Sequence, residues 1–231
     1  MRLTINPGIA LTTHMKQSII LRMDMGNSKR TEKLRRQYRN ILRRFSNAGN
    51  YDGYFIGKVS LEFNMAADAG KMSENQAHII KSRENYAELA AGGDFADGYL
   101  SIHMYLMKPV SKAAAQSNSG VQNKFATVNE YTQDMIFSKS EILSFVSDTG
   151  DFNPIHQGEH PVVPGLLILE KLILQTDIGH IGIFDLIHSF GIRFRTPLYA
   201  DEPVRLVPHK ASGRMDGYKC SDGVELFSCK Y

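Results

Sequence analysis

The sequence is short of cysteine, of long apolar runs and of net charge, and each shortage excludes a class of protein. Its only cysteines, Cys220 and Cys229, lack the Cys-x-x-Cys spacing of a metal or redox site. We expect both to be ordinary free thiols in a reducing cytoplasm. The N-terminal residues also lack the basic-then-apolar order of a signal peptide, which agrees with a cytoplasmic location.

Apolar residues are plentiful, but no run of them is long. The longest run begins at Leu166 and is interrupted by Glu170 and Lys171, well short of the ~20 residues of a membrane span. Hydrophobic residues make up 42% and charged residues 22% of the 231 residues, which is typical of globular proteins. The formal net charge of +3 is mild and does not indicate a nucleic-acid partner. We therefore expect a globular protein with no membrane span and no bound nucleic acid.

A polar stretch without periodicity, residues 111–123, divides the chain into two halves of similar length. Its Ser, Ala, Asn and Gln residues are typical of a linker or a long loop. We predict an N-terminal half over residues 1–112 and a C-terminal half over residues 124–231.

The C-terminal half is predicted to contain one buried helix among several strands. Ser138 and Glu141 form a capping box before a short helix, and Pro164 suits the first turn of a second helix that runs to about Thr176. Apolar residues occupy nearly every face of this second helix, so it must be buried on most sides. Strands are predicted before and after the helices, over residues 127–137, 190–194, 204–207, 218–220 and 224–231.

Short turns are predicted between the last strands. Asp222-Gly223 is a strong signal for a two-residue hairpin loop, and Asp216-Gly217 suggests a second turn. An antiparallel meander curled around one apolar helix is the simplest arrangement of these elements. The fold is therefore predicted to be α+β, with a curved antiparallel sheet wrapped around a central apolar helix.

The N-terminal half shows a weaker version of the same order of elements. An amphipathic helix is predicted over residues 28–45, because its apolar residues recur at helical spacing. Strands are predicted over residues 18–23, 54–63 and 99–107, whereas residues 72–89 are ambiguous. No clear sequence repeat links the halves, so a duplicated fold is inferred from the order of elements alone.

Chemical groups are concentrated in Gly150–His156, GDFNPIH, where a carboxylate and an imidazole lie five positions apart. Pro154 stiffens the turn between them and favours an extended conformation at Asn153. Pro164 and Gly165 then open the apolar helix, whose first N–H groups have no intrahelical partner. An acid, a base, a rigid turn and a nearby helix N-terminus are the parts of a general acid/base site.

Three motifs in this order, GDFNPIH, VVPGLLIL and FRTPLYADEPVRL, resemble the MaoC-like, or hydratase 2, branch of the hotdog-fold superfamily. The resemblance spans about residues 127–231. It implies a hotdog fold and an (R)-specific enoyl-thioester hydratase or 3-hydroxyacyl-thioester dehydratase, a lyase of fatty acid metabolism. The substrates would be acyl thioesters of coenzyme A or of acyl carrier protein. Because hotdog domains work in pairs, the chain would be either a single-chain double hotdog with a degenerate first half or a homodimer of C-terminal hotdogs.

In this reaction, four residues have expected roles. Asp151 and His156 would hold one water; one of them would take its proton, while the other orients the water or supplies a proton to C2. Asn153 would bond the turn backbone or orient a catalytic side chain, and the Gly165 N–H would stabilise the oxyanion. The reaction requires no metal or other cofactor, and the sequence shows no convincing cluster of metal ligands.

Each of these residues also has a purely structural interpretation. Asp151 could cap a turn with His156 exposed, and Gly165 could serve only the conformation of the helix start. The sequence departs from the family at residues 157–163, where many members have a longer segment with a short helix. Gly158 also stands where an acidic residue is often found. Both differences would shorten the part of the protein that covers the site. The sequence therefore does not define the size of the substrate.

Other functions stay open as well. An acyl thioesterase would polarise the same carbonyl but direct water at the thioester carbon, and a regulatory hotdog would bind acyl groups without turnover. The basic residues of the helix over residues 28–45 either dock an acidic carrier protein or coenzyme A phosphates, or form a solvated polar face. These residues are Lys29, Arg30, Lys33, Arg35, Arg36, Arg39, Arg43 and Arg44.

Overall fold

The computed structural model describes residues 29–49, 51, 53–64, 76–96, 98–108, 133–175, 177–178, 181–182 and 189–231. The predicted strand at residues 18–23, the predicted linker at residues 111–123 and the beginning of the strand predicted at 127–137 lie outside the described residues.

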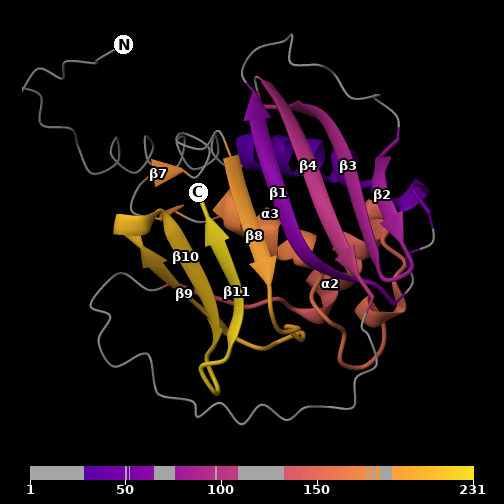
Figure 1. The fold of residues 1–231 in the computed structure, drawn as a ribbon. Helices are drawn as coiled ribbons and strands as arrows, with labels where there is room; N and C mark the ends of the chain where they lie inside the picture. Colours follow the sequence, from indigo (N-terminus) through magenta and orange to yellow (C-terminus); the bar gives the residue numbers. More distant parts are fainter. Residues whose placement is uncertain are drawn as a thin grey trace, which may run out of the picture.

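Among the described residues, nine strands form one antiparallel sheet that curves across one side of the helices (Figure 1). Their order across the sheet is β2-β3-β4-β1-β8-β11-β10-β9-β5, and a separate two-stranded ladder pairs β6 with β7. The strands are β1 (Phe55–Asn64), β2 (His78–Arg83), β3 (Tyr86–Phe95), β4 (Gly98–Met107), β5 (Gln133–Met135), β6 (Asp177–Ile178), β7 (Ile181–Gly182), β8 (Ser189–Phe194), β9 (Val204–His209), β10 (Arg214–Lys219) and β11 (Glu225–Lys230).

The two halves of the chain join where β1 pairs with β8. The antiparallel register places Val59 opposite Ile192 and Leu61 opposite Phe190, and all four side chains are buried. Successive residues of a strand point to opposite faces of the sheet, so these side chains enter the core while their neighbours face outward. One sheet and one hydrophobic core therefore run through both halves.

The described helices lie on the inner face of the sheet (Figure 1). Residues 29–42 form the N-terminal helix, α2 spans Lys139–Thr149 and α3 spans Gly165–Gln175. Single turns of 3-10 helix are η1 (Phe45–Asn47), η3 (Pro154–His156) and η4 (Lys210–Ser212).

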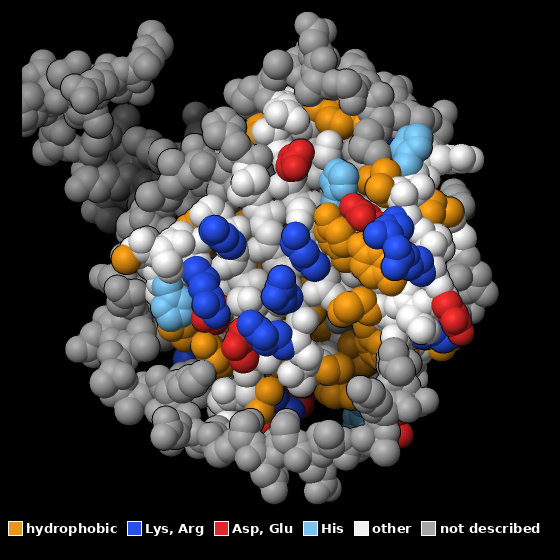
Figure 2. All heavy atoms as spheres, viewed as in Figure 1, with side chains coloured by type: hydrophobic (Ala, Val, Ile, Leu, Met, Phe, Trp, Pro, Cys, Tyr) orange, Lys and Arg blue, Asp and Glu red, His pale blue; other side chains and the backbone are white. Residues whose placement is uncertain are grey.

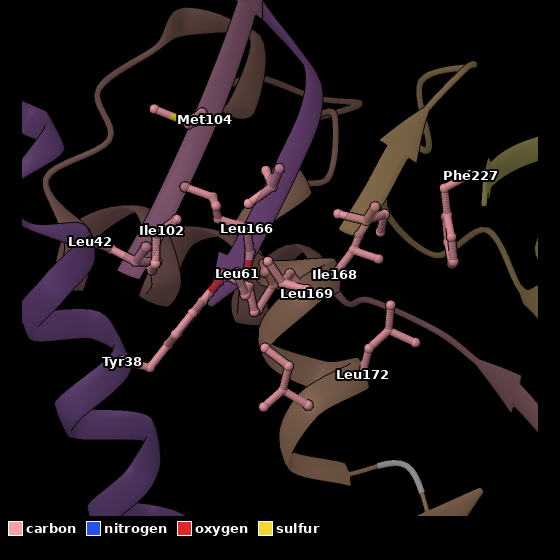
Figure 3. Close-up of a cluster of buried hydrophobic side chains, with 14 of the residues drawn as sticks. Tyr38, Leu42, Leu61, Ile102, Met104, Leu166, Ile168, Leu169, Leu172 and Phe227 are labelled. Carbon is pink, nitrogen blue, oxygen red and sulfur yellow. Dashed lines mark hydrogen bonds between the residues drawn. The ribbon is translucent and has the colours of Figure 1, made fainter. Parts of the chain in front are cut away.

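Helix α3 is the central element of the core. All its side chains from Leu166 to Ile173 are buried except the half-buried Lys171, as the apolar composition predicted. Figure 3 shows Leu166, Ile168, Leu169 and Leu172 between the N-terminal helix and strands from both halves of the chain. A curved antiparallel sheet wrapped around a central apolar helix is the hotdog fold, so the predicted fold class is confirmed.

The capping box before α2 is formed in part. Ser138 Oγ accepts a hydrogen bond from the Glu141 N–H at 3.2 Å, as predicted. The Glu141 carboxylate accepts hydrogen bonds from Lys171 Nζ on α3, at 3.1 Å to each oxygen. Its side chain therefore connects two helices.

The turn predicted at Asp216-Gly217 is wrong, because both residues lie inside β10. The Asp216 carboxylate is buried, and it accepts hydrogen bonds from Arg214 Nε at 2.7 Å and from the Tyr218 hydroxyl at 3.3 Å. His209 Nε2 on β9 lies 3.1 Å away. Residues of its own strand, with His209 on β9, thus satisfy an aspartate that would otherwise favour a turn.

The structure adds detail to the predictions at two other segments of the sheet. Asp222-Gly223 does lie in a turn, and Gly223 has a left-handed φ of 72°. The loop is longer than two residues, because the Lys219 N–H donates to the Val224 carbonyl at 2.9 Å across residues 220–223. The ambiguous residues 72–89 include β2 and the start of β3.

The outer face of the sheet carries Lys and Arg side chains across its middle, with hydrophobic side chains beside them (Figure 2). Lys58 on β1 lies directly opposite Arg193 on β8, and both are exposed. Cys220 is half-buried and Cys229 is buried, and both are free thiols. None of the helices in the described part of the chain is long and apolar enough to cross a membrane.

Candidate active site

The turn that carries Asp151 begins at the C-terminus of α2. Gly150 caps this helix with a left-handed φ of 71°, and its N–H donates to the Val146 carbonyl at 3.0 Å. Glycine adopts this conformation without the strain of a side chain. The Asp151 N–H donates to the same carbonyl at 3.2 Å. The end of α2 thus fixes the direction in which the chain enters the turn.

The Asn-Pro pair then starts η3. Asn153 Oδ1 accepts from the Ile155 N–H at 3.4 Å, and the His156 N–H donates to the Asn153 carbonyl at 3.0 Å. Pro154 suits the first position of this turn because it has no N–H to satisfy. The Asn153 N–H donates to Asp151 Oδ1 at 3.2 Å, which orients the carboxylate.

The side chains of Asp151 and His156 meet across this turn. Asp151 Oδ2 lies 3.5 Å from His156 Nε2, and the two side chains are 32% and 8% exposed. This separation exceeds an ordinary hydrogen bond, so both atoms are available to one water molecule. The structural interpretation that left His156 exposed is wrong.

The other ring nitrogen of His156 defines the tautomer. His156 Nδ1 lies 2.8 Å from the Val162 carbonyl oxygen. A carbonyl oxygen only accepts hydrogen bonds, so Nδ1 carries a hydrogen and, in the neutral ring, Nε2 has the free lone pair. The Val162 N–H donates to the Ile155 carbonyl at 2.9 Å, and Val162 also bridges to Tyr199. The short segment over residues 157–163 therefore holds the imidazole in place.

Gly165 is the first residue of α3 and lines the same cavity as Asp151 and His156. The N–H groups of a first helical turn have no intrahelical partner, so this amide is suited to an anionic oxygen. A Cβ at this position would lie 2.8 Å from the Phe194 ring. Glycine is thus also required by packing, and the two interpretations of Gly165 do not exclude each other.

The cavity beside these groups has a volume of about 750 Å³. This is within the range of ~300–1,000 Å³ that is usual for small-molecule sites. Both halves of the chain contribute its wall, which is mostly apolar. Its lining includes Leu42, Tyr51, Tyr54, Leu89, Met104 and Leu106 from the first half, and Phe145, Asp151, His156, Gly165, Ile168 and Phe194 from the second.

Asn153 also ties the site to the first half of the chain. Its Nδ2 donates to the Tyr54 carbonyl at 3.1 Å. The Asn153 side chain thus bonds backbone atoms on both sides, which is one of the two arrangements expected for it. Tyr54 was not identified from the sequence, because no local pattern links a loop before β1 to a turn after α2.

Two tyrosines stand edge to face at the wall of the cavity. The rings of Tyr51 and Tyr54 have their centres 5.5 Å apart. Burial, and to a lesser extent Tyr54, raises the pKa of the Tyr51 hydroxyl above its ordinary value. This hydroxyl therefore stays protonated at neutral pH.

The basic helix is not simply a solvated face. Arg39 donates from Nε and Nη2 to the carboxylate of Glu170 on α3, both at 2.8 Å, and Glu170 is buried. Arg44 donates to the Gly92 carbonyl on β3. The sequence analysis did not predict this ion pair; the signal that could have indicated it is the carboxylate of Glu170 within a helix that must be buried on most sides. Among the described residues, no group of three or more His, Cys, Asp and Glu residues gathers as a metal site.

Neither a protein-family model nor a curated protein sequence matches this chain. Solved structures that resemble it include a MaoC-like dehydratase from Phytophthora capsici, at 12% identity and a TM-score of 0.49, covering 79% of this chain and 73% of that one. HtdX of Mycobacterium tuberculosis is 10% identical at a TM-score of 0.49, with 78% and 76% covered. An acyl-ACP thioesterase from Bacteroides thetaiotaomicron is 10% identical at a TM-score of 0.42, with 76% and 74% covered.

These structures include one dehydratase and one thioesterase, so they do not distinguish between the two reactions. The hotdog assignment rests on the sheet and helices of this chain itself. The chain has the hotdog fold, and a MaoC-like dehydratase is among the solved structures that it resembles.

Proposed function

We propose that this chain is an (R)-specific enoyl-thioester hydratase, or a 3-hydroxyacyl-thioester dehydratase in the reverse direction. The observation that carries the proposal is the meeting of Asp151 Oδ2 and His156 Nε2, 3.5 Å apart, in a cavity that Gly165 also lines. A carboxylate, an imidazole and the N-terminus of a helix are the groups that hydration of an activated double bond requires.

Hydration adds water across C2 and C3 of the enoyl group. One water held by both side chains would attack C3 and give a proton to His156 Nε2, whose lone pair is free because Nδ1 donates to Val162. The Asp151 carboxylate would orient this water and stabilise the imidazolium that forms. The proton would then be delivered to C2 to complete the 3-hydroxyacyl product.

Negative charge develops on the thioester oxygen during the attack. The Gly165 N–H, aided by the dipole of α3, would stabilise this enolate oxygen. Without a side chain at position 165, the thioester could approach the backbone closely. Asn153 would act by orienting Asp151 through its N–H, at 3.2 Å.

The substrate would be an acyl thioester of coenzyme A or of acyl carrier protein, and the acyl group would occupy the apolar cavity. Because both halves line this cavity, the chain would work as a single-chain double hotdog, with the first half as the degenerate partner. The proposed location is the cytoplasm.

The test follows short, medium and long enoyl-coenzyme A substrates by the loss of enoyl absorbance and the formation of (R)-3-hydroxyacyl product. Asp151→Asn and His156→Ala should each lower kcat by ~10²–10⁴-fold. Asp94→Asn, an exposed aspartate on β3, is the matched control and should leave the rate unchanged. Full turnover by both site variants would refute the assignment.

The same assay measures free thiol as a second product. Release of thiol from saturated acyl thioesters, without any conversion between enoyl and hydroxyacyl groups, would replace the proposal by a thioesterase. Saturable binding without turnover, unaffected by Asp151→Asn, would indicate a non-catalytic acyl-binding protein.

A further inference from the structure

Arg39, on the N-terminal helix, contacts both elements that lead to the proposed catalytic groups. Its Nε and Nη2 donate to the two carboxylate oxygens of Glu170 on α3, both at 2.8 Å. Its Nη1 donates to the carboxylate of Asp148, in the last turn of α2, at 2.5 Å. One guanidinium therefore links the first half of the chain to α2 and α3 together.

This junction is mostly buried on the side of α3. The side chain of Arg39 is 14% exposed and that of Glu170 is 6% exposed. The guanidinium carbon also lies 5.3 Å from the centre of the Phe145 ring. A bidentate, buried ion pair has a defined geometry. The side chains of a surface ion pair, in contrast, exchange partners with water.

Tyr38 on the same helix and Arg43, just after its end, contact the same elements. The Tyr38 hydroxyl donates to the Leu166 carbonyl, in the first turn of α3, at 3.1 Å. Figure 3 shows Tyr38 reaching from the N-terminal helix toward Leu166. Arg43 Nε donates to the carbonyl of Asp148 at the end of α2. The helix therefore holds the chain immediately beside Gly165 and just ahead of Asp151.

We propose that Arg39 is a positioning residue, which holds the Asp151–His156 turn and the Gly165 amide at the separation that the reaction requires. It does not line the cavity, so it acts through the two helices and not on the substrate. The inference rests on the proposed function, because it assigns Arg39 a part in that reaction. Displacement of a catalytic group by about 1 Å can cost ~10²-fold in rate.

The test must remove the link without leaving a buried charge. The double variant Arg39→Met/Glu170→Leu replaces the ion pair by apolar side chains, a change that proteins often tolerate. Arg35, whose Nε lies 3.3 Å from Glu170, keeps its ion pair with Glu32. Its circular dichroism spectrum and melting temperature should stay close to those of the wild type. Its kcat should fall by about 10- to 100-fold with KM little changed. Arg36→Met is the control, because Arg36 is exposed on the same helix and makes no ion pair with any described residue.

A second arm tests whether the link itself sets the rate. Asp148→Asn should lower kcat in the wild type but cause no further loss in the double variant, because the Arg39 contact is already gone. Wild-type kcat in a folded double variant would overturn the proposal, and so would an equal loss from Asp148→Asn in both backgrounds.

Failure of the proposed function gives a different result, namely a wild-type protein that turns over no enoyl thioester. In that case, the positioning role of Arg39 is tested by amide hydrogen exchange over residues 148–166, which requires no turnover. Exchange at the turn and at the start of α3 should be faster in the double variant than in Arg36→Met. Equal exchange in the two proteins would overturn the positioning role.

Discussion

At the scale of single residues, the chemistry of the site depends on which hydrogen bonds are already made. His156 has one nitrogen occupied by Val162 at 2.8 Å, so only the other is left for a water. The motif Gly150–His156 predicted that an acid and a base would share one tight turn, and their side chains do meet there. The Val162 contact could not be predicted, because it depends on how the short segment over residues 157–163 folds back.

Gly165 offers a prediction about packing. Gly165→Ala keeps the backbone N–H but brings a Cβ to 2.8 Å from the Phe194 ring. The expected cost is about 1–3 kcal/mol in the free energy of unfolding, because the ring must move, and kcat should fall with it. Phe194→Leu combined with Gly165→Ala should recover much of this loss in urea unfolding. Absence of recovery would show that the ring is not the cause.

The Tyr38 hydroxyl should make the free energy of unfolding depend on pH. Burial, and then the nearby Glu170, raises the pKa of its hydroxyl well above the ordinary value. The unfolded chain loses this proton first, so the stabilisation is complete below about pH 10 and is lost as the pH rises above it.

Tyr38→Phe should therefore cost about 1 kcal/mol at neutral pH, through the lost hydrogen bond to Leu166. The difference from the wild type should shrink at about pH 11, because only the wild type has this group to ionise. Urea unfolding at both pH values checks it. An equal difference at both would contradict the role given to Tyr38.

At the scale of elements, local signals located the helices well and the turns less well. The apolar sequence of α3 required burial on most faces, and Ser138 gave the start of α2. The turn predicted at Asp216-Gly217 is wrong, because Arg214 and Tyr218 of the same strand satisfy the Asp216 carboxylate. The ion pair of Arg39 was not predicted, since its partner Glu170 lies far away in the sequence. Local patterns give periodicity and caps, but they do not report contacts between distant segments.

The cap of α2 gives a prediction for an element. Ser138→Ala should lower the free energy of unfolding by about 1 kcal/mol, because the Glu141 N–H loses its acceptor. Ser147→Ala, exposed in the last turn of the same helix, should have almost no effect. Urea denaturation of both variants measures the difference. A Ser138→Ala protein as stable as Ser147→Ala would contradict the cap.

At the scale of the whole molecule, the site belongs to both halves of the chain. The seam between β1 and β8 continues the sheet, and first-half residues such as Leu89 and Met104 line the cavity. The order of elements suggested a duplicated arrangement, but the pairing across the seam could not be predicted. Neither strand carries a sequence signal for its partner, because pairing between distant strands is decided by packing on the shared core.

A cross-link at the seam tests this arrangement. Lys58 and Arg193 are direct cross-strand partners, and such pairs have Cα atoms ~4.5–5.5 Å apart, a distance that a disulfide spans. Lys58→Cys/Arg193→Cys should therefore oxidise within one chain, which non-reducing electrophoresis and peptide mass spectrometry would show. Each single variant is a control. Cross-links that join two chains would contradict a seam formed within one molecule.

The central claim is that His156 acts on a bound acyl thioester from the turn that it shares with Asp151. The most direct measurement compares kcat for enoyl-thioester hydration in His156→Gln and in His160→Gln, an exposed histidine of the following segment. We predict a loss of ~10²–10⁴-fold for His156→Gln and none for His160→Gln. A His156→Gln protein that hydrates enoyl thioesters at the wild-type rate would contradict the account.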